Sequence, residues 1–144
     1  MKTPSTEKQN WKTVKFNEML EQYAEDLQYT KDLDDMLWLF IRESSTARSY
    51  PSYLKRDFEE AAYSKLTNIL LGIDLRKTDR RQMAPTDLKK KLKKLIDNGN
   101  GLGGYLRVHL IYVSMKFRRK INIERINQEQ YIKEIGGEIQ NGED

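Results

Sequence analysis

The chain has 144 residues and a formal net charge of +4; 33% of its residues are charged and 10% are aromatic. This length suits one domain with its own core, and the aromatic content excludes a chain that stays disordered. The absence of cysteine excludes a disulfide framework and a thiolate metal site, and it fits a reducing compartment. No apolar stretch is long enough for a membrane span or a signal peptide, so we expect a soluble, cytoplasmic protein.

The spacing of the apolar residues predicts an all-α fold, a single-domain compact bundle of about five to six helices over residues 1–144. A first helix lies within residues 8–29, and Thr30 caps a second helix that contains "MLWLFI". After "SSTARSY", Pro51 starts the helix of "PSYLKRDFEEAAYSKLTNILLG", which Gly72 ends.

The polar connector "IDLRKTDRRQMAP" leads to further helices. The next one opens near Pro85 and closes at "DNGNG". Residues 105–120 favour a strand by composition, but their apolar residues repeat at spacings of 4, 3 and 4, which a strand cannot place on one face: Leu106, Leu110, Val113 and Phe117. We therefore predict a helix there. A last short helix is expected to begin near Ile123 or Asn127, before a flexible tail at residues 136–144.

The predicted helix of residues 105–120 has a second apolar stripe, opposite its core-facing residues. It consists of Val108, Ile111 and Met115. A helix that is apolar on two sides either lies in the middle of a bundle or presents one side to another subunit. We predict that this stripe is buried, in the core or in a protein interface.

Candidate catalytic and metal-binding residues have simpler structural explanations. His109 is the only histidine, so it cannot belong to a two-histidine metal site, and we interpret it as a half-buried packing residue. "GNGLGG" at residues 99–104 follows a helix, not a strand, and so indicates a turn instead of a phosphate loop. Three carboxylates in "DLDD" suit the first turn of a helix: Asp32, Asp34 and Asp35. We predict no enzyme, no metal and no cofactor.

Charge is distributed unevenly along the sequence. The net charge is −3 over residues 1–75, +11 over residues 76–125 and −4 over residues 126–144. Such sorting bears on partners more than on folding, because concentrated charge attracts ligands of the opposite sign. The basic middle segment is the first candidate for a binding surface.

A lysine-rich helix is the strongest functional signal in this segment. In "DLKKKLKKLID", Lys90, Lys93 and Lys94 point away from the apolar stripe, and Lys89 and Lys91 flank it. A helix that is only solvated mixes glutamate with lysine at i,i+4, because like charges repel by roughly 0.2–0.5 kcal/mol per pair. Residues 89–94 contain no such pair among themselves, so we predict an external anion, most commonly a phosphate backbone. A solvated basic face without a ligand is the alternative.

Two arginine-containing clusters extend this basic region. One lies in the connector, and the other ends the next helix as "KFRRK". A short glycine turn predicts antiparallel packing of the two helices, which would bring both clusters to one end. The predicted nucleic-acid-binding residues are Arg76, Lys77, Arg80, Arg81, Lys89, Lys90, Lys93, Lys94, Lys116, Arg118, Arg119 and Lys120.

"PTDLKKKLKKLI" and "GGYLRVHLIYVSMKF" are similar to helices of the small helical subunits of type III CRISPR effector complexes. Those subunits pair a basic helix with a "YL-basic-V…Y" helix and line a groove for nucleic acid. The resemblance covers about 30 residues. The C-terminal aromatic helix of that family has no counterpart in "EIGGEIQNGED", and the first 85 residues find no match. The resemblance implies a nucleic-acid-binding subunit.

The sequence as a whole predicts a non-enzymatic accessory subunit of a larger nucleoprotein complex. It would bind the backbone of RNA or DNA largely without sequence specificity. The alternative is a protein-binding adaptor or inhibitor, for example one encoded by a phage or another mobile element, which uses the basic face and the apolar stripe. An enzyme using the carboxylates of "DLDD" ranks third. Protein partners or self-association are expected, and a membrane is not.

Overall fold

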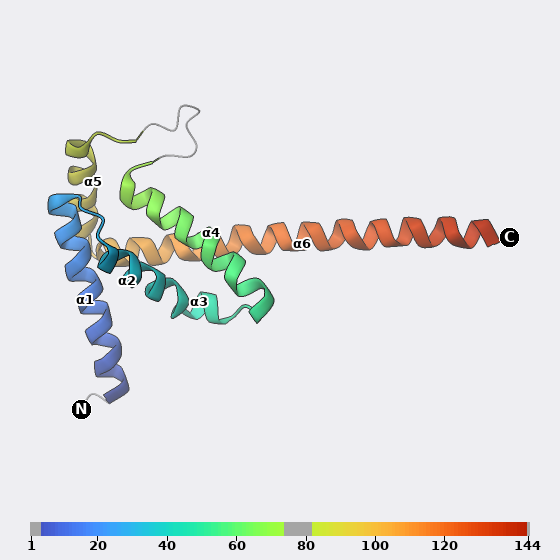
Figure 1. Ribbon diagram of the computed structural model, residues 1–144, viewed down its shortest axis with the longest axis horizontal. Helices are drawn as coiled ribbons and strands as arrows, with labels where there is room; N and C mark the ends of the chain where they lie inside the picture. The colour runs from blue at the N-terminus through green and yellow to red at the C-terminus, as the bar shows by residue number, and fades with distance from the viewer. Residues whose placement is uncertain (1–3, 74–81, 144) are drawn as a thin grey trace.

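Helices make up almost the whole of the described chain. The computed structural model describes the backbone of residues 4–73 and 82–143 and the side chains of residues 13–73 and 82–134. Apart from an isolated bridge between Ile73 and Gln82, these ranges contain no strand. The predicted all-α class is confirmed. The helices are α1 (Pro4–Asp26), α2 (Lys31–Arg42), α3 (Ser45–Arg48), α4 (Ser52–Leu71), α5 (Pro85–Asp97) and α6 (Gly101–Glu143) (Figure 1).

Several helix boundaries are set by the capping residues that the sequence contains. Thr30 Oγ1 accepts a hydrogen bond of 3.2 Å from the backbone N–H of Leu33, which fixes the start of α2. Ser44 caps α3 in the same way. Helix α4 ends at Gly72, whose φ of 72° lies in the left-handed region that glycine adopts without a steric cost. The predicted start of α2 at Thr30 and the predicted end of α4 at Gly72 are thus confirmed.

The core lies where α4 packs against α2 and α6 and where α1 packs along α5 (Figure 1). Burying a leucine or phenylalanine side chain stabilises the fold by about 1.5–3 kcal/mol relative to exposing it. The buried residues of α1, α2, α4, α5 and α6 form one apolar core, as predicted for a bundle. Its largest fully buried side chains are Leu20, Leu33, Leu37, Ile41, Phe58, Leu66, Leu70, Leu92, Leu102, Leu106 and Leu110.

An aromatic cluster joins the middle of α6 to the corner between α3 and α4. The centroid of the Tyr50 ring lies 4.7 Å from that of Phe58 and 5.5 Å from that of Phe117. The Tyr50 hydroxyl is also hydrogen-bonded to Ser114 Oγ at 2.7 Å, and both residues are buried. A tyrosine suits this position because its ring fills the core while its hydroxyl satisfies a buried polar group.

Helix α6 is much longer than the sequence predicted. A separate last helix near Ile123 or Asn127 was expected, and this is wrong: α6 is continuous for 43 residues. Residues 105–135 contain neither glycine nor proline, so nothing in them ends a helix. Its backbone is helical to Glu143. The expected flexibility of residues 136–144 stays a prediction.

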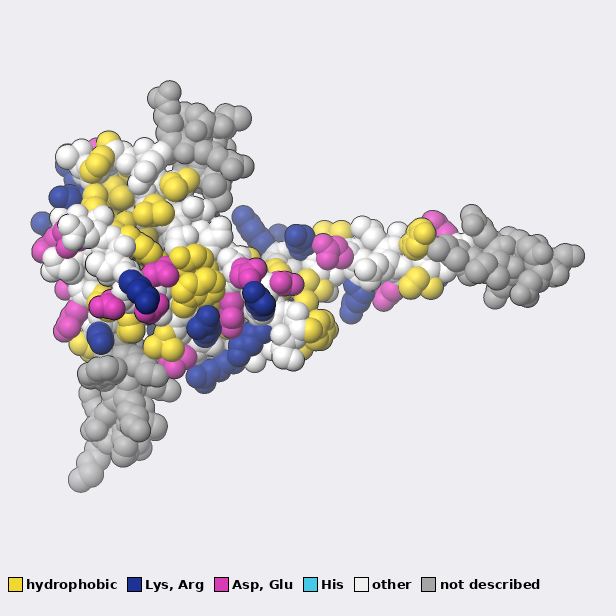
Figure 2. Space-filling view, in the orientation of Figure 1, with side chains coloured by type: hydrophobic (Ala, Val, Ile, Leu, Met, Phe, Trp, Pro, Cys, Tyr) yellow, Lys and Arg dark blue, Asp and Glu magenta, His cyan; other side chains and the backbone are white. Residues whose placement is uncertain are grey.

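The C-terminal part of α6 projects away from the body (Figure 1). At about 1.5 Å per residue, the 43 residues of α6 extend over about 64 Å. Residues 121–134, the α6 arm, are exposed at every position after Ile121. Figure 2 shows hydrophobic side chains among the charged ones along this projecting part. None of the described helices combines the length and the apolarity that crossing a membrane requires.

Candidate nucleic-acid interface

Helix α5 presents the lysine-rich sequence on the surface of the body. Pro85 lies in its first turn, where the missing N–H leaves no hydrogen bond unmade. Leu88 and Leu92 are buried, and α5 contacts both α1 and α6. The opposite side of the helix faces solvent, as predicted. The lysine face consists of five exposed residues: Lys89, Lys90, Lys91, Lys93 and Lys94.

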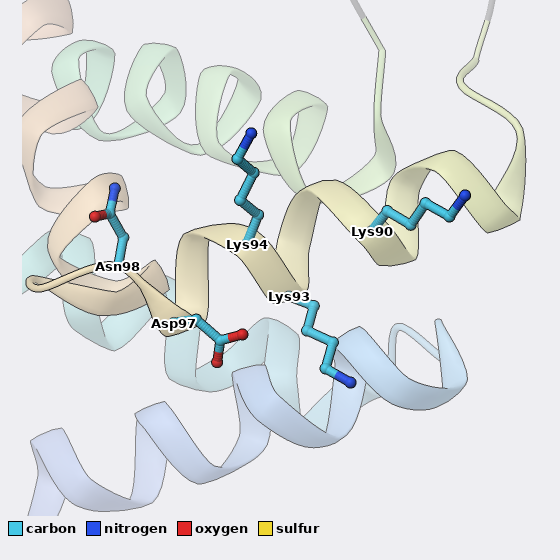
Figure 3. Close-up of a pocket in the computed structure, with 5 residues that line it drawn as sticks. All are labelled: Lys90, Lys93, Lys94, Asp97 and Asn98. Carbon is cyan, nitrogen blue, oxygen red and sulfur yellow. The ribbon is translucent and has the colours of Figure 1, made fainter.

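The outer side of α5 is shallowly hollowed. A depression of about 470 Å³ is lined by Lys90, Lys93, Lys94, Asp97 and Asn98. In Figure 3, Lys94 points to one side of α5, Lys93 and Asp97 point to the other, and Lys90 extends along the helix. Four of these residues lie on α5, and Asn98 follows directly after it. The depression is therefore an open surface hollow, which suits an extended anionic ligand better than an enclosed small molecule.

The lysine face has no ion-pair partner among the described residues. Ion pairs do occur elsewhere on the body: Arg56 Nε lies 3.2 Å from Glu60 Oε1, and Arg42 Nε lies 3.9 Å from Glu59 Oε2. Acidic and basic side chains are accordingly intermixed over the body in Figure 2. The five lysines of α5 concentrate positive charge on one helix, and no ion pair among the described residues offsets it.

Asp26 at the end of α1 interacts electrostatically with Lys89, at one edge of the lysine face. Hydrogen bonds from the Gln22 side chain and from the backbone N–H of Gln28 lower the pKa of Asp26, and Lys89 adds a weaker electrostatic effect in the same direction. Because Asp26 is fully exposed, solvent screens this interaction. Lys89 is therefore only partly neutralised.

The second predicted basic group lies on α6, away from the lysine face. Lys116 and the basic residues 118–120 are exposed, and they begin about 22 Å along α6 from Gly101. The predicted antiparallel packing of α5 and α6, which would bring the basic groups to one end, is wrong: α5 crosses α6 near its start (Figure 1). A short turn keeps two helix ends close, but side-chain packing decides their crossing angle.

Arg118 already has partners within the fold. Its Nη2 donates a hydrogen bond of 3.1 Å to Ser49 Oγ, and its guanidinium carbon lies 5.3 Å from the centre of the Tyr50 ring. The remaining exposed basic residues of this group are Lys116, Arg119 and Lys120. The predicted connector residues lie outside the described residues: Arg76, Lys77, Arg80 and Arg81.

The glycines of "GNGLGG" serve the start and the packing of α6. A Cβ atom at Gly103 would lie 2.5 Å from Asn17 Oδ1 on α1, which is closer than real contacts allow. A larger residue at this position would require the Asn17 side chain to turn aside. This geometry agrees with the interpretation of the stretch as a structural turn instead of a phosphate loop.

His109 is half-buried, as predicted. Its ring centroid lies 4.5 Å from that of Tyr105 and 5.7 Å from that of Tyr112. Burial lowers the pKa of His109 below its usual value of 6.5, and the charges of Lys65 and Lys91 lower it further. The neutral imidazole is thus favoured, which suits a packing residue.

Asp34 of "DLDD" is hydrogen-bonded to two tyrosines within the fold. Asp34 Oδ1 accepts hydrogen bonds from the hydroxyls of Tyr29 at 2.7 Å and Tyr63 at 2.5 Å. The pKa of Tyr29 is raised chiefly by burial, and that of Tyr63 chiefly by this hydrogen bond. The side chains that the structure describes contain no cluster of three or more His, Asp or Glu residues suited to a metal. Sequence reasoning missed the hydrogen bond between Tyr63 and Asp34 because these two residues lie 29 positions apart in the chain.

The second apolar stripe of α6 is exposed. Val108, Ile111 and Met115 expose 40%, 46% and 49% of their surface. Burial in the core is therefore wrong for these residues, because the body packs on the opposite side of α6; the interface alternative stays a prediction. Ile123 and Ile126 are exposed as well. Sequence reasoning missed their connection to the stripe because it ended the helix before them.

Comparisons with protein-family models, with curated proteins and with solved structures find no match to this chain. The resemblance to small subunits of type III CRISPR effector complexes therefore rests on the two quoted segments alone. The chemistry of the exposed surface is the basis for any functional conclusion.

Proposed function

We propose that this protein binds the phosphate backbone of a nucleic acid through the lysine face of α5. The observation that carries the proposal is the set of five exposed lysines on one helix, none of them in an ion pair among the described residues. Like charges at i,i+4 repel by roughly 0.2–0.5 kcal/mol per pair. An anionic partner that binds between these lysines offsets their repulsion. A nucleic-acid strand offers such charges at a regular spacing of about 3.4 Å.

Binding of this kind is largely independent of sequence. Lysine side chains act as mobile point charges, and the lysine face contains no planar amide or guanidinium suited to paired hydrogen bonds with base edges. Lys116, Arg119 and Lys120, which begin about 22 Å along α6 from Gly101, are a second candidate contact for the same strand.

The direct test removes positive charge from the outer part of α5. The changes are Lys90→Gln, Lys93→Gln and Lys94→Gln in one chain. We expect weaker gel shifts with short single- and double-stranded DNA and RNA of every sequence, because phosphate contacts are lost. For duplex DNA, the slope of log affinity against log salt should decrease by about 0.9 per lost contact. The melting temperature should stay constant or rise slightly, since like-charge repulsion is relieved.

A matched control removes the same charge from other places. Lys31→Gln, Lys55→Gln and Lys133→Gln change α2, α4 and the α6 arm, and we expect much smaller effects on affinity and salt slope. Equal affinity and an equal salt slope for the α5 variant and the unaltered protein would overturn the proposal. The lysines would then be a solvated surface only.

A protein-binding adaptor or inhibitor is the second candidate function. The exposed stripe of Val108, Ile111 and Met115 favours it, since exposed apolar rows mark protein interfaces. In that case the lysine face meets an acidic protein surface. Retention on heparin without a gel shift for any nucleic acid would favour this candidate over the first.

A further inference from the structure

We propose that the nucleic acid bound by this protein is single-stranded and that its bases stack on aromatic side chains of α6. This inference rests on the proposed backbone binding and names the class of nucleic acid. The surface that carries it, the α6 row, consists of aromatic residues followed by basic residues on one flank of the helix: Tyr105, His109, Tyr112, Lys116, Arg119 and Lys120.

The α6 row follows one line along the helix. Its members stand at i, i+4, i+7, i+11, i+14 and i+15, so at 3.6 residues per turn they fall within about 100° of the helix circumference. The rings come first and the cations follow, over about 22 Å. Residues 105–120 contain five basic residues and no acid. Aromatic faces joined to uninterrupted positive charge are typical of surfaces that bind single strands.

Lysines from two other helices lie beside the aromatic part of the α6 row. Helices α4 and α5 both contact α6 (Figure 1). Burial lowers the pKa of His109, and the charges of Lys65 on α4 and Lys91 on α5 lower it further, which places both ammonium groups near the imidazole. Neither lysine is in an ion pair among the described residues. Because Lys91 belongs to the lysine face, the row connects that face to the second basic group.

Tyr112 is the ring of the row that is most open to a base. It exposes 53% of its surface. Its contact with His109 is edge-to-face, with an interplanar angle of 88° and ring centroids 5.7 Å apart, so the imidazole covers at most one face of the phenol ring. Trp38, by contrast, is stacked on Tyr63 at 4.1 Å and 9°. A base on the open face of Tyr112 lies about one helical turn from Lys116.

The fold makes no described use of the Tyr112 hydroxyl. Four other tyrosines have hydroxyls that are hydrogen-bonded within the body: Tyr23, Tyr29, Tyr50 and Tyr63. The Tyr112 hydroxyl has no such bond in the part of the chain that the structure describes. Neither hydrogen bonding nor burial therefore explains an aromatic ring at this position, whereas stacking on a ligand does.

Stacking on Tyr112 requires unpaired bases. In a duplex, neighbouring base pairs cover both faces of each base, so a helix on its surface meets base edges and phosphates only. In a single strand the bases turn outward and their faces become accessible to aromatic side chains. Every base has such a face, so this contact adds affinity without selecting a sequence. The α6 row thus favours a single strand of RNA or DNA.

The first test separates the bases from the phosphates. Fluorescence anisotropy measures binding of the full chain to a strand of about 12 thymidines, to an abasic strand of the same length and charge, and to a duplex of that length. The abasic strand should bind at least about fivefold more weakly than the thymidine strand, because stacking is lost. The duplex, despite its greater charge, should bind no more tightly than the thymidine strand. A tighter duplex would overturn the proposal.

The second test removes the ring. Tyr112→Leu should weaken binding of the thymidine strand at least about fivefold. It should leave the abasic strand, the duplex and the salt slope unchanged, because no phosphate contact is lost. Tyr112→Phe keeps the ring and should bind as the unaltered chain does. Tyr53→Leu, at a tyrosine of α4 that is 78% exposed, is the matched control and should have no effect. Melting temperatures verify that each variant folds.

The outcomes distinguish this inference from the proposed backbone binding. Equal affinity of the unaltered chain for the thymidine and abasic strands would overturn stacking, and so would equal affinity of Tyr112→Leu and the unaltered chain for the thymidine strand. Backbone binding would still stand if the α5 lysine variant weakened all three complexes. No binding of any of the three nucleic acids would overturn both proposals.

Discussion

The two parts of α6 contain apolar residues at similar spacing but have opposite surroundings. In the first part, Leu102, Leu106 and Leu110 are fully buried against the body. In the α6 arm, Ile123 and Ile126 repeat at helical spacing and remain exposed. The comparison teaches that helical periodicity indicates which residues share a face, whereas burial depends on whether another element lies against that face.

The largest expected effect is a core truncation in the first part of α6. Leu106→Ala should lower the free energy of unfolding by about 2–5 kcal/mol, because the lost methyl groups leave a cavity among fully buried neighbours. Ile126→Ala, measured in a dilute monomeric sample, should change it by less than about 0.5 kcal/mol. Urea unfolding of both variants compares the two parts directly. Equal losses would show that the arm packs against the body in solution.

A smaller effect is expected from the hydrogen bond that holds the middle of α6. Tyr50→Phe removes the hydroxyl that meets Ser114 Oγ at 2.7 Å, and we expect a loss of about 0.5–1.5 kcal/mol in unfolding free energy. Tyr112→Phe, at an exposed residue of α6, should have almost no effect.

A double-mutant cycle sharpens this prediction. Adding Ser114→Ala to Tyr50→Phe should cost little more than Tyr50→Phe alone, since both polar partners are then gone. Strict additivity of the two single changes would contradict a direct interaction between them.

The smallest expected effect is a pH dependence of stability from His109. Burial lowers its folded-state pKa below 6.5, so the unfolded chain binds its proton at higher pH than the folded chain does. The stability is fully present above pH 6.5 and decreases as pH falls through that value, levelling off below the folded pKa. His109→Gln should flatten the curve of melting temperature against pH between about pH 5.5 and 7.5. A curve unchanged by the substitution would contradict this account.

Much of the fold was predictable because it depends on local rules. Thr30 and Gly72 mark helix ends by capping chemistry, and the lysines of α5 are exposed because buried leucines define the opposite side of the helix. The expected end of a helix before Ile123 was wrong. The residues around it are charged, but charged residues alone do not end a helix, and residues 105–135 contain no glycine or proline that would. The roles of the candidate binding residues stay predictions, since they depend on a partner outside the chain.

The amino-acid sequence by itself determined the helical class, most helix ends and the division of α5 into an apolar and a lysine face, because each follows from contacts within a few residues. Only the tertiary structure decided that α5 crosses α6 near its start and that Val108, Ile111 and Met115 of α6 are exposed. Crossing angles and exposure result from packing between segments far apart in the chain, such as α1 against α5 and α4 against α6. Residue spacing within one helix does not contain that information.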